Sequence, residues 1–179
     1  MGGTAAVRRR RQARAPERYS GLQIGLHWTI AALVILQLVY NEPMQQAFDE
    51  RLETGRIGLP GGGALVHIVA GSLVLLLALV RVFVRFRRGA PAPHKDKPKF
   101  VTWIGEATHV ALYVMIFAMP LTGLAAWLFG AEGIGALHEV GRLAFIPIIG
   151  LHVIGALAEH FVFKNDGLMR MFRPASDGR

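Results

Sequence analysis

Four histidines of this 179-residue chain lie in or against long apolar stretches: His27, His67, His138 and His152. An ionisable side chain at membrane depth is costly to bury, and such residues usually carry a function. Neutral imidazole is the commonest protein ligand for metal ions. Two pairs of imidazoles could therefore hold two metal centres, provided that the fold brings the four histidines together in pairs.

The elements that must position these histidines are predicted to be membrane helices. Hydrophobic residues make up 53% of the chain and charged residues only 18%, whereas charged residues approach a quarter of a soluble domain. A hydrocarbon core of ~30 Å needs about 20 helical residues, and four apolar stretches are long enough, at residues 23–40, 64–86, 105–129 and 141–163. We predict an all-α, integral membrane four-helix bundle over residues 18–174. A basic disordered arm, 1–17, would precede it, and a tail, 175–179, would follow.

The charges predict the orientation of the bundle. Residues 1–18 carry six Arg and one Glu, and residues 85–99 carry three Arg and three Lys against one Asp. Residues 41–63 and 130–139 are each acidic by two charges. Because basic connections stay in the cytoplasm, both termini and the middle connection are predicted to be cytoplasmic, in a bacterial inner membrane. Topology thus explains the net charge of +8, and no nucleic-acid partner is expected.

Topology and helix geometry predict how the histidines pair. With both termini inside, His27 lies near the cytoplasmic side, and His67 and His138 lie near the outside. His152 follows His138 by 14 residues, which is about 21 Å and close to four whole turns, so the two share a face. The predicted pairs are His67 with His138 at the outer level and His27 with His152 at the inner level.

Paired histidines in apolar surroundings suit haem iron, which accepts two axial imidazoles. Zinc fits less well, because catalytic zinc usually needs three clustered protein ligands. Glycines beside the four histidines would let a flat macrocycle approach the backbone, although small residues also simply pack membrane helices together; they are Gly25, Gly71, Gly141 and Gly155. The chain has no cysteine, which excludes covalent c-type haem and Cys-ligated clusters.

Two arginines could hold haem propionates. Arg81 follows His67 by 14 residues and lies near the inner level, where it would meet a propionate or snorkel to the interface. Arg142 follows His138 by one turn and could meet a propionate at the outer level, or do nothing specific.

Other residues near the inner surface leave alternatives open. His109 and His160 could replace an inner ligand, exchange protons with a quinone, or be ordinary interfacial residues. Pro120 is expected to kink the third helix, which offers no histidine at the outer level and would complete the bundle wall. Trp28 is interpreted first as an anchor at the membrane interface.

These residues resemble the prokaryotic cytochrome b561 family, and the likeness covers about residues 19–174. The stretches that carry it are Gln23-Ile24-Gly25-Leu26-His27-Trp28, His67 with Gly71 and Arg81, His109-Val110-Ala111-Leu112-Tyr113, Pro120-Leu121-Thr122-Gly123, His138-Glu139, Gly150-Leu151-His152-Val153, His160-Phe161 and Asp166-Gly167-Leu168-Met169-Arg170-Met171.

The resemblance implies two haem b groups, ligated at His27, His67, His138 and His152. It also implies electron transfer between quinone and a partner; one type in the family oxidises superoxide and reduces ubiquinone. The sequence departs from the family in two places. Many relatives have a histidine where this chain has Glu159, and the outer connection between the third and fourth helices is very short here.

The sequence is compatible with two main functions. The first is an oxidoreductase that moves electrons from an outer donor, such as superoxide, to ubiquinone. Because the outer connections are acidic, a positive patch for an anionic donor would have to come from Arg51, Arg56 and Arg142. The second is a non-catalytic anchor subunit of a dehydrogenase or hydrogenase, docked through Asp49, Glu50 and Glu53. A haem-free helical scaffold or transporter is a weaker third option.

Overall fold

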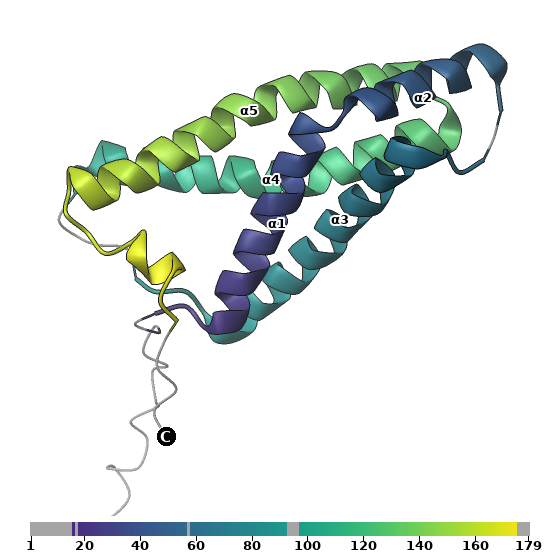
Figure 1. Ribbon diagram of the computed structural model, residues 1–179. Coiled ribbons are helices and arrows are strands. Elements are labelled where there is room, and N and C mark those ends of the chain that lie inside the picture. Colours follow the sequence, from purple (N-terminus) through teal and green to yellow (C-terminus); the bar gives the residue numbers. More distant parts are fainter. Residues whose placement is uncertain (1–15, 17, 57, 93–96, 175–179) are drawn as a thin grey trace, which may run out of the picture.

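The structure, a computed structural model, describes residues 16, 18–56, 58–92 and 97–174. The described chain is all-helical and contains no strand (Figure 1). The predicted basic arm, apart from Pro16, and the predicted tail lie outside the described residues. The elements are α1 (Gly21–Val39), α2 (Glu42–Thr54), α3 (Gly62–Arg88), α4 (Lys99–Phe129), α5 (Glu132–Phe161) and a 3₁₀ turn, Met169–Met171.

The four predicted membrane spans are confirmed as helices long and apolar enough to cross a bilayer: α1, α3, α4 and α5. Their outward faces carry many exposed Leu, Ile, Val and Phe side chains, as expected where lipid replaces water. α5 begins at Glu132 rather than at residue 141, so His138 lies two turns inside the helix instead of at its start. Only Gly130 and Ala131 connect α4 to α5, which confirms the very short connection.

The helices run alternately up and down, so the bundle has two distinct ends (Figure 1). The α2 end comprises α2, the starts of α3 and α5, and the end of α4. The terminal end comprises the start of α1, the end of α3, the start of α4 and the end of α5. Gln23 Nε2 donates to the carbonyl of Gly89 at 2.9 Å, which ties the start of α1 to the end of α3.

α2 was not predicted, and it folds over one end of the bundle. Pro43 lies in its first turn and Gly55 ends it with a φ of 66°, both favourable at those positions. Met44, Phe48 and Leu52 recur every four residues and form an apolar face that lines a partly open cavity. This face makes α2 a cover for the bundle rather than a free connection.

Two glycines let α2 lie close to the bundle. A Cβ added at Gly135 of α5 would come within 2.5 Å of Phe48 Cε1. A Cβ added at Gly63, at the start of α3, would come within 2.8 Å of Pro43 Cβ and of the Tyr40 hydroxyl. A larger residue at either position would force these neighbouring side chains to shift.

An apolar layer fills the middle of the bundle. Its buried residues are Ile30, Val34, Val74 and Phe145. Phe145 lies seven residues from both His138 and His152, so it is about 10 Å from each level along the helix axis. The layer therefore separates the two histidine levels. Neighbouring α4 is one continuous helix with Pro120 inside it.

Candidate functional site

At the terminal end, α1 and α5 bring His27 and His152 together. Their ring centres are 6.2 Å apart and the planes are inclined by 69°. The ring of His109, from α4, also lies beside that of His152, with ring centres 5.2 Å apart. His109 Nδ1 donates to the Gly105 carbonyl at 2.7 Å, because a carbonyl oxygen can only accept.

The separation of His27 and His152 suits a shared metal ion. Two imidazoles that bind one metal from opposite faces have ring centres about 6 Å apart, since a metal–nitrogen bond is about 2 Å and the ring centre lies about 1 Å behind the nitrogen. A Cβ added at Gly25 or Gly155 would meet nothing within 4 Å. Both glycines are exposed, and no described residue fills the space beside them.

At the α2 end, His67 of α3 and His138 of α5 line one cavity of about 550 Å³. This volume lies within the range of pockets that bind cofactor-sized molecules. The Met44, Phe48 and Leu52 face of α2 covers it, and its lining is mainly apolar. His67 Nδ1 is buried without a hydrogen-bond partner among the described residues.

α4 contributes to this cavity without supplying a histidine. Thr122 Oγ1 lies 3.1 Å from His138 Nδ1. A Cβ added at Gly123 would come within 3.0 Å of His138 Cε1. On α1, Gln37 Nε2 donates to the carbonyl of His67 at 3.0 Å. The prediction that α4 only completes the bundle wall therefore missed its contacts with His138, one of the candidate ligands.

The two predicted propionate partners differ in their contacts. Arg81 is half-buried, and its Nη1 donates to the Gln23 carbonyl at 3.1 Å. Arg142 lines the α2-end cavity and forms an ion pair with Glu139, one turn away on α5. Each guanidinium has further N–H groups that an anionic group could accept from.

A positive patch at the α2 end, considered from the sequence, does not form among the described residues. Arg51 is 8% exposed, and it donates to the carbonyls of Arg56, at 2.7 Å, and of Leu128, at 3.2 Å. Its guanidinium also lies over the Trp127 ring. With Arg142 paired to Glu139, Arg56 is the exposed arginine that the structure describes at this end.

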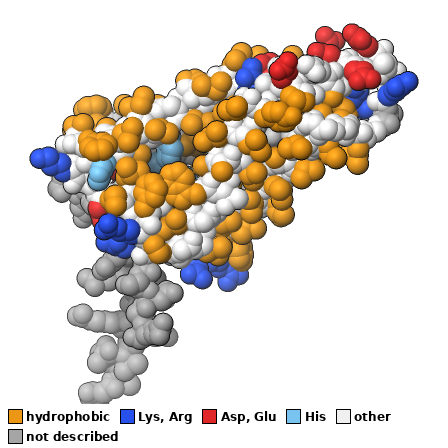
Figure 2. Space-filling model, in the orientation of Figure 1, with side chains coloured by type: hydrophobic (Ala, Val, Ile, Leu, Met, Phe, Trp, Pro, Cys, Tyr) orange, Lys and Arg blue, Asp and Glu red, His pale blue; other side chains and the backbone are white. Residues whose placement is uncertain are grey.

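Acidic side chains dominate the surface of the same end. Figure 2 shows them gathered over α2, with Lys and Arg mainly at the opposite end. The exposed acids here are Glu42, Asp49, Glu50, Glu53 and Glu132. An anionic solute approaching this end meets a repulsive field, and a cationic one meets an attractive field.

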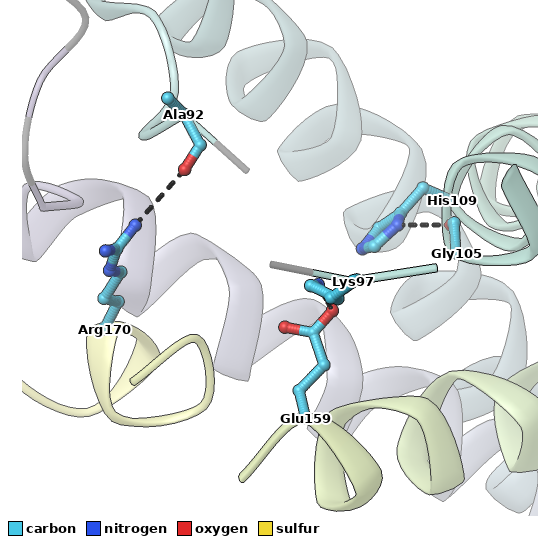
Figure 3. A network of polar contacts seen from close by, with 6 residues as sticks. All are labelled: Ala92, Lys97, Gly105, His109, Glu159 and Arg170. Carbon is cyan, nitrogen blue, oxygen red and sulfur yellow. Dashed lines mark hydrogen bonds and ion pairs between the residues drawn. The ribbon is translucent and has the colours of Figure 1, made fainter. Parts of the chain in front are cut away.

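The terminal end is held by polar contacts from three segments (Figure 3). Lys97, just before α4, forms an ion pair with Glu159 near the end of α5. Arg170 pairs with Asp166 at 2.8 Å and donates to the Ala92 carbonyl at 3.4 Å. Glu159 therefore anchors the segment that leads into α4.

Trp28 and His160 also have particular surroundings. Trp28 Nε1 donates to the Met171 carbonyl at 2.9 Å, and its ring lies 5.0 Å from that of Phe172. Trp28 thus holds the C-terminal segment beside His27 as well as lying near the predicted interface. His160 packs against Phe161, and its Nδ1 is buried without a partner in the described chain.

Comparison with known proteins decides the family. The model of the family described as prokaryotic cytochrome b561 matches residues 18–174. The chain belongs to this family. Family membership, with four spanning helices, makes the protein a multi-pass membrane cytochrome of bacterial electron transport, and the prokaryotic cytochrome b561 family implies haem b as its cofactor.

Named relatives cover nearly the whole chain. Cytochrome b562 from Cereibacter sphaeroides is 32% identical over 87% of this chain and 96% of its own length. Probable superoxide oxidase CybB from Yersinia pestis is 27% identical, with the same two coverages. Cytochrome b561 homolog 2 from Escherichia coli is 23% identical over 90% of this chain and 94% of its own length.

The residues present fit haem b. A histidine pair at metal-sharing separation and a mainly apolar cavity lined by two histidines suit axial ligation by histidine.

Proposed function

We propose that this protein holds two haem b groups and passes electrons between a donor at the α2 end and ubiquinone. His67 and His138 would ligate the haem at the α2 end, and His27 and His152 the haem at the terminal end. The observation that supports this most strongly is the presence of two histidine pairs at opposite ends of one bundle, separated by an apolar layer. Each haem supplies one-electron redox chemistry when bound.

The protein's own residues would hold and orient the two groups. Arg142 lines the α2-end cavity, and Arg81 projects near the terminal-end pair from α3. Their free N–H groups suit the carboxylates of haem propionates. The basic connections at the terminal end support a cytoplasmic location for that end, with the α2 end outside.

Quinone chemistry needs protons as well as electrons, and His109 is the best-placed group to exchange them. Its Nδ1 is occupied by the Gly105 carbonyl, so in the neutral form Nε2 carries a free lone pair. Its ring adjoins that of His152. Figure 3 shows it projecting from α4 toward the segment that carries Lys97. We infer that the quinone headgroup binds near His109.

The identity of the donor separates two versions of this function. The likeness to a probable superoxide oxidase supports superoxide as the donor and an oxidoreductase activity. The acidic α2 end supports a different donor, a soluble redox protein with a basic face, and a role as an electron-transfer subunit. Opposite charges on two protein surfaces accelerate their association, whereas the same acidic field slows an anion.

Haem content and one rapid-mixing measurement test both versions. A pyridine haemochrome assay on the purified protein should give two b haems per chain, and a colourless folded protein from haem-replete cells would refute the proposal. Superoxide is then mixed with the oxidised protein in a stopped-flow instrument. Fast haem reduction without a partner supports the oxidoreductase, and absence of reduction favours the subunit.

A further inference from the structure

We propose that Thr122, together with Gly123, is a positioning residue that holds His138 in the tautomer able to bind iron through Nε2. The inference rests on the proposed ligation of haem by His138. It concerns α4, which supplies no ligand at this level, and the contact that its side chains make with α5.

The hydrogen bonds of Thr122 set the direction of its bond to His138. A threonine hydroxyl has one proton to donate. Thr122 Oγ1 lies 2.8 Å from the Ala118 carbonyl and 3.1 Å from the Met119 carbonyl, and both oxygens can only accept. The hydroxyl proton therefore goes to the preceding turn of α4, as is usual for threonine within a helix.

The remaining lone pairs of the hydroxyl can only accept. With the hydroxyl proton on the Ala118 carbonyl, His138 Nδ1, at 3.1 Å, would donate to Thr122 Oγ1. A neutral imidazole has one N–H, so protonation at Nδ1 leaves Nε2 with a free lone pair. The other tautomer would place a proton on Nε2, block metal binding there, and lose the shorter bond to Ala118.

Gly123 provides the room that this contact needs. A Cβ at this position would be 3.0 Å from His138 Cε1 and 3.3 Å from His138 Nδ1. The imidazole thus lies against the backbone of α4 at Gly123 while its Nδ1 reaches the hydroxyl of the preceding residue. His109 Nδ1 donates in the same way to a carbonyl of its own helix, but His138 depends on a neighbouring helix for its acceptor.

A hydrogen bond donated by Nδ1 raises the basicity of a metal-binding imidazole. A more basic ligand stabilises ferric iron, so the bond should lower the midpoint potential of the α2-end haem. Loss of the bond should favour the ferrous form by up to tenfold, which is about 59 mV for a one-electron couple.

The test compares Thr122→Val, which keeps the shape of the side chain, with Thr122→Ser, which keeps the hydroxyl. The readouts are the midpoint potential of each haem, the electron paramagnetic resonance signal of each ferric haem, and haem per chain. A variant with His152→Ala, which should keep only the α2-end haem, assigns the signals. We expect Thr122→Val to raise the midpoint potential of the α2-end haem alone. Thr122→Ser should keep the wild-type potential.

Thr108→Val is the matched control. Thr108 is also on α4 and donates to the carbonyl four residues earlier, at 2.7 Å from Ile104, and no bond from it to a histidine is found in the described chain. This variant should leave the α2-end haem unchanged. Gly123→Ala tests the second half of the proposal and should weaken retention of that haem by displacing the His138 ring.

Three outcomes would overturn the proposal while leaving the proposed function intact. In the first, Thr122→Val leaves the midpoint potential and the spectrum of the α2-end haem unaltered. In the second, Thr122→Ser changes them as much as Thr122→Val does. In the third, Thr122→Val loses both haems. A wild-type protein without haem would instead refute the proposed function itself.

Discussion

The two ends of the bundle hold their histidines in different ways. At the α2 end, His67 and His138 line a partly open cavity under a short amphipathic helix. At the terminal end, His27 and His152 are only 6.2 Å apart between ring centres, and His109 adjoins them. An acidic surface surrounds the first site. The second is bordered by the Lys97–Glu159 pair and by the C-terminal segment on Trp28.

This difference shows how one bundle can serve two kinds of partner. A helix with a polar outer face covers the α2-end site, so on the proposed function a donor would reach it from the aqueous side. The terminal-end site has an exposed histidine, His109, on a helix whose neighbouring surface is apolar, which suits a partner dissolved in lipid. Two similar histidine pairs would therefore acquire separate roles, because different surfaces cover them.

The largest effect is expected from removing one ligand of the terminal-end pair. His152→Ala should reduce the haem content from two to one per chain, because His27 alone cannot hold a six-coordinate iron. The pyridine haemochrome assay measures the ratio of haem to protein. His160→Ala, on the same helix, should keep both haems, and loss of neither haem in His152→Ala would refute the assignment.

The cover over the α2 end can be displaced through Gly135. Gly135→Ala would place a Cβ 2.5 Å from Phe48 Cε1 and push α2 off the cavity. We expect the α2-end haem to be lost several-fold faster to a haem-binding acceptor protein, with the terminal-end haem unaffected. Gly133→Ala is the matched control, since its added Cβ would meet nothing within 4 Å. Equal rates in the two variants would show that α2 does not retain the haem.

The acidic surface should control which donor reacts fastest. Changing Asp49, Glu50 and Glu53 together to Asn, Gln and Gln removes three exposed charges. At low ionic strength, electron exchange with a basic c-type cytochrome should slow several-fold and reaction with superoxide should quicken, and salt should reduce both effects. Stopped-flow rates at two salt concentrations measure this. Unchanged rates would mean that the surface does not steer either partner.

The smallest effect is expected from the ion pair at the terminal end. Lys97→Met should cost about 1 kcal/mol, because Lys97 is nearly buried but Glu159 remains partly exposed to solvent. The thermal midpoint should fall by about 2–4 °C for a chain of this size. Lys99→Met, an exposed lysine beside it, should leave the midpoint unchanged. A larger fall in the control would assign the effect to general charge loss.

The spanning helices and the histidine juxtapositions could be predicted because each depends on a simple period. Apolar length alone predicts the four helices. The spacing of 14 residues between His138 and His152 predicts that they share a face of α5. The structure accordingly brings His152 to His27 and puts His138 in one cavity with His67.

The missing features depend on contacts between segments that no local pattern reveals. The residues of α2 are mostly polar, and the acids among them were counted as part of a connection. The first residues of α5 lie outside the predicted span, although Gly135 packs closely against Phe48. Thr122 looks like any hydroxyl in a membrane helix until the position of His138 is known. Arg51 looked like a surface charge, but the carbonyl of Leu128 accepts its proton inside the fold.

The apolar layer around Phe145 has an electrical consequence. An electron that passes between the two histidine levels is displaced by about 21 Å along the helix axis, most of a hydrocarbon core of ~30 Å. A charge that crosses the whole core works against or with about 2.3 kcal/mol per 100 mV of transmembrane voltage. Turnover should therefore respond to the energised state of the cell, slowing when the interior is strongly negative.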